Sequence, residues 1–119
     1  MNEKRRIGDF GEDLAVSYMT SKGYEILCRN YLKPYGEIDI IALKDDIICF
    51  VEVKTRKSSQ FSYPREAVNY HKQQRIIKAS QMYMIENNIN NYLMRFDVVE
   101  VLTESRKINY IENAFWIYR

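Results

Sequence analysis

The sequence is poor in the residues that break regular structure or cross-link small folds. Its 119 residues include only 4 glycines, 2 prolines and 2 cysteines, which excludes a collagen-like, low-complexity or disulfide-framework composition. Cys28 and Cys49 form no Cys-x-x-Cys pair, which argues against a structural zinc site. The single histidine, His71, has no serine or cysteine at a spacing typical of a nucleophile–histidine pair. We therefore expect reduced, buried thiols and no histidine-based hydrolase.

Long apolar segments are missing as well. No apolar run approaches the length of a membrane span, and residues 1–6 lack the apolar stretch of a signal peptide. The 18 basic and 16 acidic side chains leave a net charge of +2, which is a weak indication of an anionic partner. With 46% hydrophobic residues, the chain is typical of one globular domain over residues 1–119. We expect a cytoplasmic protein without a membrane partner.

The most informative stretch covers residues 36–56. Segments 38–43 and 47–53 are rich in branched residues, and a short polar break that includes Asp45–Asp46 separates them. This pattern predicts two β-strands joined by a tight turn.

Charged side chains inside these two strands indicate their register. Side chains alternate between the faces of a strand, so Glu37 and Asp39 share one face, as do Glu52 and Lys54. If Asp45–Asp46 is a two-residue loop, Asp39 lies opposite Glu52 and Glu37 lies opposite Lys54. A shift of one residue would move a carboxylate to the other face. The predicted register therefore places two carboxylates side by side with a lysine nearby.

Two carboxylates directly opposite each other destabilise a sheet unless something offsets their repulsion. A divalent cation would do so, and Mg²⁺ and Mn²⁺ prefer oxygen ligands of this kind. We predict a metal site at Asp39 and Glu52, with Lys54 placed to orient a water or to stabilise negative charge. The alternative is that these charges form the solvated face of an antiparallel sheet. The apolar neighbours Val51 and Val53 favour a covered strand, where unpaired carboxylates are costly.

An aspartate followed about a dozen residues later by Glu-x-Lys on the next strand resembles the metal site of the PD-(D/E)XK nucleases. That pattern alone is a weak signal, but further motifs extend the resemblance over most of the chain. Together they are similar to the YraN-like family of uncharacterised bacterial proteins. The motifs are Gly8-x-x-Gly11-Glu12, Gly23-Tyr24, Gly36-Glu37-Ile38-Asp39, residues 50–56, and Lys72 with Arg75.

The resemblance implies a restriction-endonuclease-like α/β fold, with an αβββαβ core in which helices flank a central mixed sheet. It also implies a metal-dependent endonuclease that hydrolyses DNA, with Mg²⁺ or Mn²⁺ bound by Asp39, Glu52, the Val53 carbonyl and Glu12. Glu12 matches a glutamate that related nucleases place on the first helix; the alternative is a surface glutamate. Holliday-junction resolvases are similar in size and layout, so branched DNA is the substrate expected by analogy, with single-stranded DNA also open. Because so small a domain cannot enclose a duplex, we expect a homodimer to help it grip two strands.

Other segments predict the elements that complete this order. Gly23 is expected to end the first helix, which would pack through a stripe that includes Phe10, Leu14 and Tyr18. The aromatic tail over 113–119 is expected to dock on the core, with a dimer contact as the alternative. The predicted elements are a helix over 5–22, a strand over 24–30, a connector over 31–35, the two strands already described, a loop over 55–64, a short helical turn over 64–68, a helix over 70–87, and strands over 92–102 and 107–111.

Basic residues beside the predicted site indicate contacts with a nucleic-acid backbone. Arg56 and Lys57 begin a polar loop from which phosphate contacts are expected. Lys72 falls in line with the packing stripe of the second long helix, so we expect its stem to lie along the sheet toward the site, with Arg75 one turn further on. The alternatives are a solvated loop and charges at a helix edge. The same loop also carries Phe61, Tyr63 and Arg65.

Two classes of function follow from these patterns. The first is a metal-dependent endodeoxyribonuclease, in which Asp39, Glu52 and Lys54 are catalytic. The alternative is a non-catalytic nucleic-acid-binding or scaffold protein that retains the nuclease fold, and an RNA-directed hydrolase is a weaker third hypothesis. Arg95 and Asp97 share a face of their strand, and we expect an ordinary ion pair between them.

Overall fold

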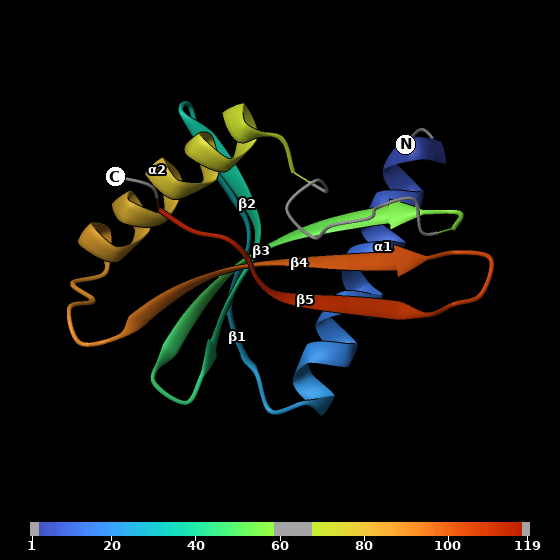
Figure 1. Cartoon of the computed structure of the whole chain (residues 1–119), viewed down its shortest axis with the longest axis horizontal. Helices are drawn as coiled ribbons and strands as arrows, with labels where there is room; N and C mark the ends of the chain where they lie inside the picture. The colour runs from blue at the N-terminus through green and yellow to red at the C-terminus, as the bar shows by residue number, and fades with distance from the viewer. Residues whose placement is uncertain (1–2, 59–67, 118–119) are drawn as a thin grey trace.

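The computed structural model describes residues 3–58 and 68–117, with the side chains of residues 9–58 and 68–117. Within these ranges the elements are α1 (Glu3–Ser21), β1 (Glu25–Lys33), β2 (Gly36–Lys44), β3 (Ile47–Arg56), α2 (Tyr70–Glu86), β4 (Leu93–Leu102) and β5 (Ile108–Phe115). They form a mixed α/β structure with a central sheet of five strands in the order β1-β2-β3-β4-β5 (Figure 1). Neighbouring strands are antiparallel except β3 and β4, which are parallel. The predicted mixed sheet with flanking helices is confirmed.

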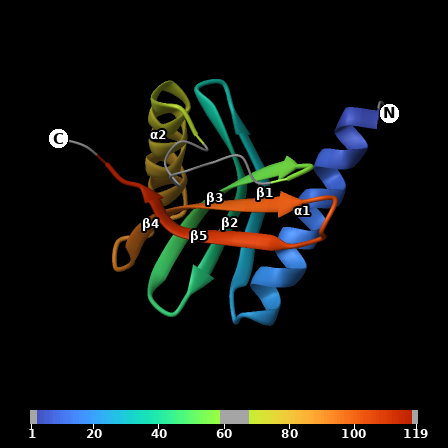
Figure 2. The same ribbon diagram turned by 45° about the vertical axis from the view of Figure 1, so that its right-hand side comes forward.

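The two helices cover opposite faces of the sheet (Figure 2). Side chains alternate along the central strand β3, so one set faces each helix. Such a strand is buried on both sides, which explains its continuous apolar sequence. The core against α2 includes Ile48, Phe50, Ile76, Phe96, Val98 and Phe115. The core against α1 includes Ala15, Met19, Cys49, Val51 and Val99.

The end of α1 agrees with the sequence, but part of its packing stripe does not. Gly23 has a φ of 94°, in the left-handed region that favours glycine at a helix end, and the chain turns there toward β1. Ala15 and Met19 are fully buried, whereas Phe10 is 46% exposed. The prediction that Phe10 belongs to the packing stripe is wrong, since this turn of the helix meets the sheet through Gly11, which lies against Thr55 of β3. Neither helix, over the parts described, combines the length and apolar character needed to cross a membrane.

Two strands extend further than predicted. The connector expected over 31–35 is wrong in its first half, because Tyr31 and Lys33 pair with β2 and belong to β1. The loop expected from Thr55 is wrong at its start, because Thr55 and Arg56 pair with β4 and belong to β3. Tertiary pairing decides both boundaries. The rest of that loop from residue 59 on, and most of the helical turn predicted over 64–68, lie outside the described residues.

The C-terminal aromatic segment begins as a strand. β5 continues to Phe115, beyond the predicted end at residue 111, since it pairs with β4 as far as Phe96. Phe115 is buried in the core against α2, and its ring stacks on that of Phe96 with centroids 5.2 Å apart. The predicted docking on the core is confirmed for this residue. Trp116 is 44% exposed.

The sheet opens into a fork between β2 and β3. Their antiparallel pairing starts at the Asp45–Asp46 turn in the predicted register and ends at the pair Ile40–Val51. Beyond that pair, β2 stays with β1 as far as Gly36, while β3 stays with β4 as far as Arg56, so the two strands diverge (Figure 1). We call this divergence the fork.

The fork corrects one predicted pair. Glu37 does not lie opposite Lys54, because the β2–β3 pairing has already ended at Ile40–Val51. Glu37 pairs with Leu32 on β1 instead. Asp39 and Glu52 follow directly after the last β2–β3 pair, so they occupy the point at which the strands separate.

A close contact at Gly36 holds the start of β2 against α2. A side chain at this position would place its Cβ 2.6 Å from the backbone carbonyl oxygen of Arg75. Only glycine therefore allows this approach, and the approach brings one arm of the fork to the first turns of α2. A carbonyl in the middle of a helix cannot move aside as a flexible side chain would.

Gly36→Ala is expected to lower the free energy of unfolding by about 1–3 kcal/mol, because the added methyl group must push β2 and α2 apart. Urea unfolding measures this change. Glu37→Ala is the matched control, since Glu37 is the exposed neighbour and its change should stay within about 0.5 kcal/mol. Equal stability of the Gly36→Ala and wild-type proteins would mean that β2 and α2 are not in this close contact.

Candidate active site

The fork brings together acidic and basic residues predicted from the sequence. Asp39 lies on β2, whereas Glu52 and Lys54 lie on β3. Glu52 is buried, and its Oε2 lies 3.5 Å from Nζ of Lys54. Nζ of Lys72, from the first turn of α2, contacts the same oxygen. Two strands and a helix therefore deliver these side chains to one point.

Asp39 and Glu52 form a close pair of carboxyl groups, of which Glu52 is buried and Asp39 is half-buried. Burial, the charge of Glu52 and a hydrogen bond between the two side chains raise the pKa of Asp39 to about 8. The Val53 N–H and Lys72 act in the opposite direction, and the Val53 N–H donates to Oδ2 of Asp39 at 2.8 Å. This bond satisfies a backbone donor that the open fork leaves without a strand partner. The prediction that these two carboxylates lie close together is confirmed.

Lys72 supplies positive charge to the pair. Burial alone lowers the pKa of Lys72, but the hydrogen bond and charge of Glu52, followed by the charges of Asp39 and Glu37, outweigh it and raise that pKa. The side chain of Asn69 caps the helix by accepting from the Lys72 N–H at 2.9 Å, which fixes the start of α2 beside the fork. The predicted direction of Lys72, along the sheet and toward the site, is confirmed.

The donor set at the fork fits a hard divalent cation. Asp39 and Glu52 present carboxylate oxygens, which suit Mg²⁺ or Mn²⁺ better than zinc. Within the described residues, no group of three or more His, Cys, Asp and Glu side chains could hold a metal ion. Further ligands would therefore come from water and from backbone, such as the predicted Val53 carbonyl.

Glu12 approaches the fork from the α1 side. It is buried, and its Oε1 accepts from Nε of Arg29 at 2.9 Å and from Nδ2 of Asn30 at 3.1 Å. Asn30 lies beside Asp39 in the β1–β2 pairing, between the pairs Arg29–Ile40 and Tyr31–Ile38. Asn30 thus lies between Glu12 and the Asp39–Glu52 pair. Because Glu12 is buried, it is not the surface glutamate considered as the alternative. Its role as a metal ligand stays a prediction.

Glu100 is a buried acid that the sequence analysis missed. In the parallel β3–β4 pairing it lies beside Lys54, and it is 3% exposed. Its Oε1 accepts from Nδ2 of Asn109 at 3.0 Å, while Oε2 has no hydrogen-bond partner among the described residues. Like Glu52, Glu100 is a carboxylate inside an otherwise apolar strand. This pattern in the sequence could have identified it as a candidate site residue.

The four basic residues predicted to bind nucleic acid lie at different depths. Lys72 is part of the site itself. Arg75 is exposed one turn further along α2. Arg56 is the last residue of β3 and partly buried, and Lys57 follows it in an exposed position. Phe61, Tyr63 and Arg65 lie outside the described residues.

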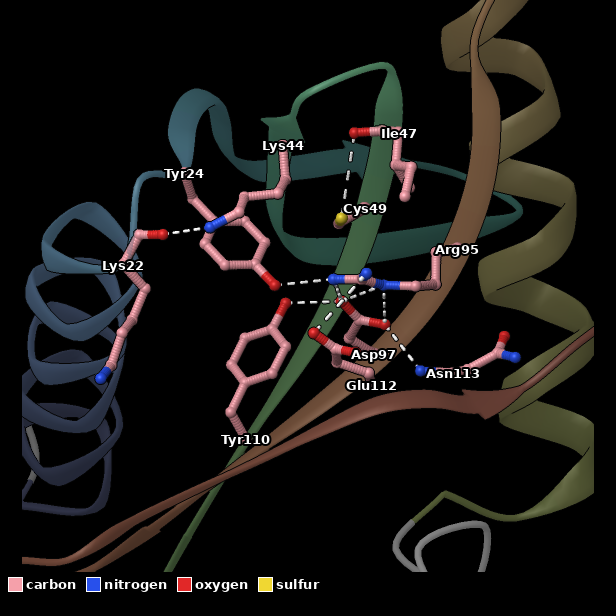
Figure 3. A network of polar contacts seen from close by, with 10 residues as sticks. All are labelled: Lys22, Tyr24, Lys44, Ile47, Cys49, Arg95, Asp97, Tyr110, Glu112 and Asn113. Carbon is pink, nitrogen blue, oxygen red and sulfur yellow. Dashed lines mark hydrogen bonds and ion pairs between the residues drawn. The ribbon is translucent and has the colours of Figure 1, made fainter.

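Asp97 is a further buried acid, and it has a structural role (Figure 3). Its carboxylate accepts from Nε of Arg95 at 2.9 Å, from the Tyr110 hydroxyl at 2.5 Å and from the Asn113 N–H at 2.9 Å. Arg95 also donates to the Tyr24 hydroxyl at 2.6 Å. The predicted ion pair is confirmed. The network lies among the core residues that face α1 and ties β4 and β5 to the start of β1, away from the acids of the fork.

Fold and site define a mixed α/β protein whose described residues form a five-stranded central sheet with a helix on each face, and a cluster of carboxylates and lysines around the buried Glu52 where the sheet opens. A family model described as uncharacterised protein family UPF0102 matches residues 11–101. The chain belongs to this family, which confirms the predicted YraN-like membership. The matched range includes every predicted site residue.

Relatives are similar over nearly their whole length. A UPF0102 protein of Clostridioides difficile is 51% identical over 115 residues, which cover 97% of this chain and 100% of that protein. A UPF0102 protein of Alkaliphilus oremlandii is 53% identical over 119 residues, covering 97% and 100%. A UPF0102 protein of Caldanaerobacter subterraneus subsp. tengcongensis is 46% identical over 117 residues, covering 94% and 96%.

Proposed function

We propose that this protein is a Mg²⁺- or Mn²⁺-dependent endonuclease that hydrolyses phosphodiester bonds of DNA on a restriction-endonuclease-like αβββαβ core. The observation that carries the proposal is the Asp39–Glu52 pair at the fork, in which Glu52 is buried and Asp39 is half-buried, with Lys54 and Lys72 directed at the Glu52 carboxylate. Withdrawing two adjacent carboxyl groups from water costs stability, and perturbed groups of this kind concentrate at functional sites.

Asp39 and Glu52 would hold the metal, with the Val53 carbonyl as a further predicted ligand and Glu12 acting through a bound water. Bound there, Mg²⁺ or Mn²⁺ would lower the pKa of a coordinated water and offset the negative charge of the phosphate. The Val53 N–H and the Asn30 side chain orient Asp39 and Glu12, respectively, through the hydrogen bonds already described. Such outer contacts set the direction of the ligand oxygens.

Lys54 and Lys72 stabilise the negative charge that develops on the phosphate. Both ammonium groups already lie at the Oε2 atom of Glu52, so they need little rearrangement to act there. Lys54 is on a rigid central strand and would position the attacking water, whereas Lys72 would contact a phosphate oxygen. Arg56, Lys57 and Arg75 would bind neighbouring phosphates and set the position of the strand.

A cleavage assay tests the proposal. Purified protein is incubated with labelled single-stranded, duplex, flap and four-way-junction DNA and with single-stranded RNA, in Mg²⁺, in Mn²⁺ and in EDTA. We expect metal-dependent cleavage of a branched or single-stranded substrate, and none with the isosteric variant Glu52→Gln. DNA that is bound but never cleaved would favour the alternative, a nucleic-acid-binding or scaffold protein that retains the fold. Cleavage of RNA in preference to DNA would instead support an RNA-directed hydrolase.

A further inference from the structure

A cavity of about 420 Å³ adjoins the candidate active site. It lies between the end of the β1–β2 hairpin and the first turns of α2, which are side by side in Figures 1 and 2. We call it the hairpin pocket. Residues of its wall that matter here are Leu32, Glu37, His71, Lys72, Arg75 and Ile76.

The hairpin pocket opens onto the site through Lys72. This lysine lines the pocket and also contacts Glu52 at the fork. Glu37, on the opposite wall, is close enough for its charge to act on Lys72. A group bound in the pocket would therefore lie close to a phosphate bound at Lys72. The two could belong to one nucleotide, as a base and its own phosphate do.

The wall combines apolar and planar side chains with positive charge at one end. Ile76 is buried and Leu32 is 66% exposed, and both provide apolar surface on the wall of the pocket. His71 and Arg75 are exposed planar groups able to stack on an aromatic ring. The pocket volume falls within the range of small-molecule sites, roughly 300–1,000 Å³.

We propose that the hairpin pocket binds the base of an unpaired nucleotide next to the phosphate that is cleaved, so the substrate is single-stranded at the cut. This inference rests on the proposed nuclease function and names its substrate class. The cations of the wall, Lys33, Lys72 and Arg75, would attract a phosphate, but a phosphate would leave the apolar surface of Leu32 and Ile76 uncovered. A base covers that surface, and one with an exocyclic amino group can also donate to the carboxylate of Glu37.

Duplex DNA does not present such a base. Its bases are stacked and paired, and turning one out costs a few kcal/mol, whereas an unpaired base needs no such step. The hairpin pocket would thus favour single strands, flaps and the open centre of a branch over continuous duplex. This preference arises from a side pocket and is separate from the chemistry at Asp39 and Glu52.

Binding of two short probes tests this inference in EDTA, where no cleavage occurs. One probe is a fluorescein-labelled six-residue oligodeoxycytidylate; the other is the same backbone with six abasic residues, which has equal charge and no bases. We expect wild-type protein to bind the first about tenfold more tightly, since stacking of one base contributes at this level. Leu32→Ala should remove several-fold of that difference and leave the abasic probe unchanged.

A matched control is available at the other end of the molecule. Leu93, at the start of β4, is also 66% exposed but does not line the hairpin pocket, so Leu93→Ala should bind both probes like wild type. Both substitutions remove an exposed leucine and should leave the fold intact. Equal binding of the two probes by wild-type protein, or the same loss with Leu93→Ala, would overturn the inference while leaving the nuclease proposal standing. Binding of neither probe would count against both.

Discussion

Glu52→Gln is expected to abolish both DNA cleavage and Mn²⁺ binding, whereas Lys54→Met is expected to abolish cleavage alone. Glu52 is the buried member of the carboxylate pair at the fork, so its loss removes a metal ligand and should reduce cleavage by about 10³-fold or more. Lys54 lies 3.5 Å from that carboxylate but carries no ligand atom. Removing its charge should cost about 10²- to 10³-fold in cleavage by leaving the transition state unstabilised.

The two readouts are the cleavage rate and Mn²⁺ binding measured by titration calorimetry. Glu104→Gln is a suitable control, since it changes an exposed glutamate in the turn before β5 and should alter neither quantity. If Lys54→Met cleaves like wild type, the lysine has no catalytic role. If Glu52→Gln still binds Mn²⁺ with wild-type affinity, the metal does not lie at the fork.

Asp39→Asn is expected to stabilise the metal-free protein at pH 8, by an amount of the order of a few kcal/mol. The pKa of Asp39 is raised to about 8 in the folded state, mainly by burial and then by Glu52, and it is near 3.9 in the unfolded chain. Between these values the folded state holds a proton that the unfolded state has released. The contribution of Asp39 to stability therefore falls as pH rises from about 4 to about 8. Asparagine carries no charge at any of these pH values, so the variant does not lose this contribution to stability as the pH rises.

Urea unfolding in EDTA at several pH values measures the effect as the difference between variant and wild type. Asp46→Asn, at an exposed turn position, should not reproduce it. Added Mn²⁺ should stabilise wild type more at pH 8 than at pH 5, because the metal replaces the proton of Asp39, and should stabilise Asp39→Asn much less. A pH-independent difference between wild type and Asp39→Asn would show that this carboxyl group does not titrate abnormally.

Local patterns in the sequence determined much of the site. The apolar run before Glu52 marks a central strand buried on both faces, and the two-residue turn at Asp45–Asp46 specifies the register of the hairpin up to the fork. Helical spacing places Lys72 in line with Ile76 and thus toward the sheet. These predictions succeed because each depends on residues that are close together in the chain.

The fork itself was decided only by the tertiary structure. The register of a hairpin predicts which residues would pair if pairing continued, but not where pairing stops. It stops after Ile40–Val51 because β2 remains with β1 and is drawn to α2 at Gly36, while β3 remains with β4. Of those partners, α2 and β4 are remote in sequence from the strands that they hold. The same cause places Glu37 in the hairpin pocket and not opposite Lys54.

The position of Glu100 beside Lys54 is a further result of the tertiary structure. The register of the parallel strands β3 and β4 depends on the whole crossover through α2, and no turn between them specifies it. The sequence by itself therefore determined which side chains carry charge on each strand. The packing of helices and strands decided which of those charges meet, because it sets distances between residues that the chain keeps far apart.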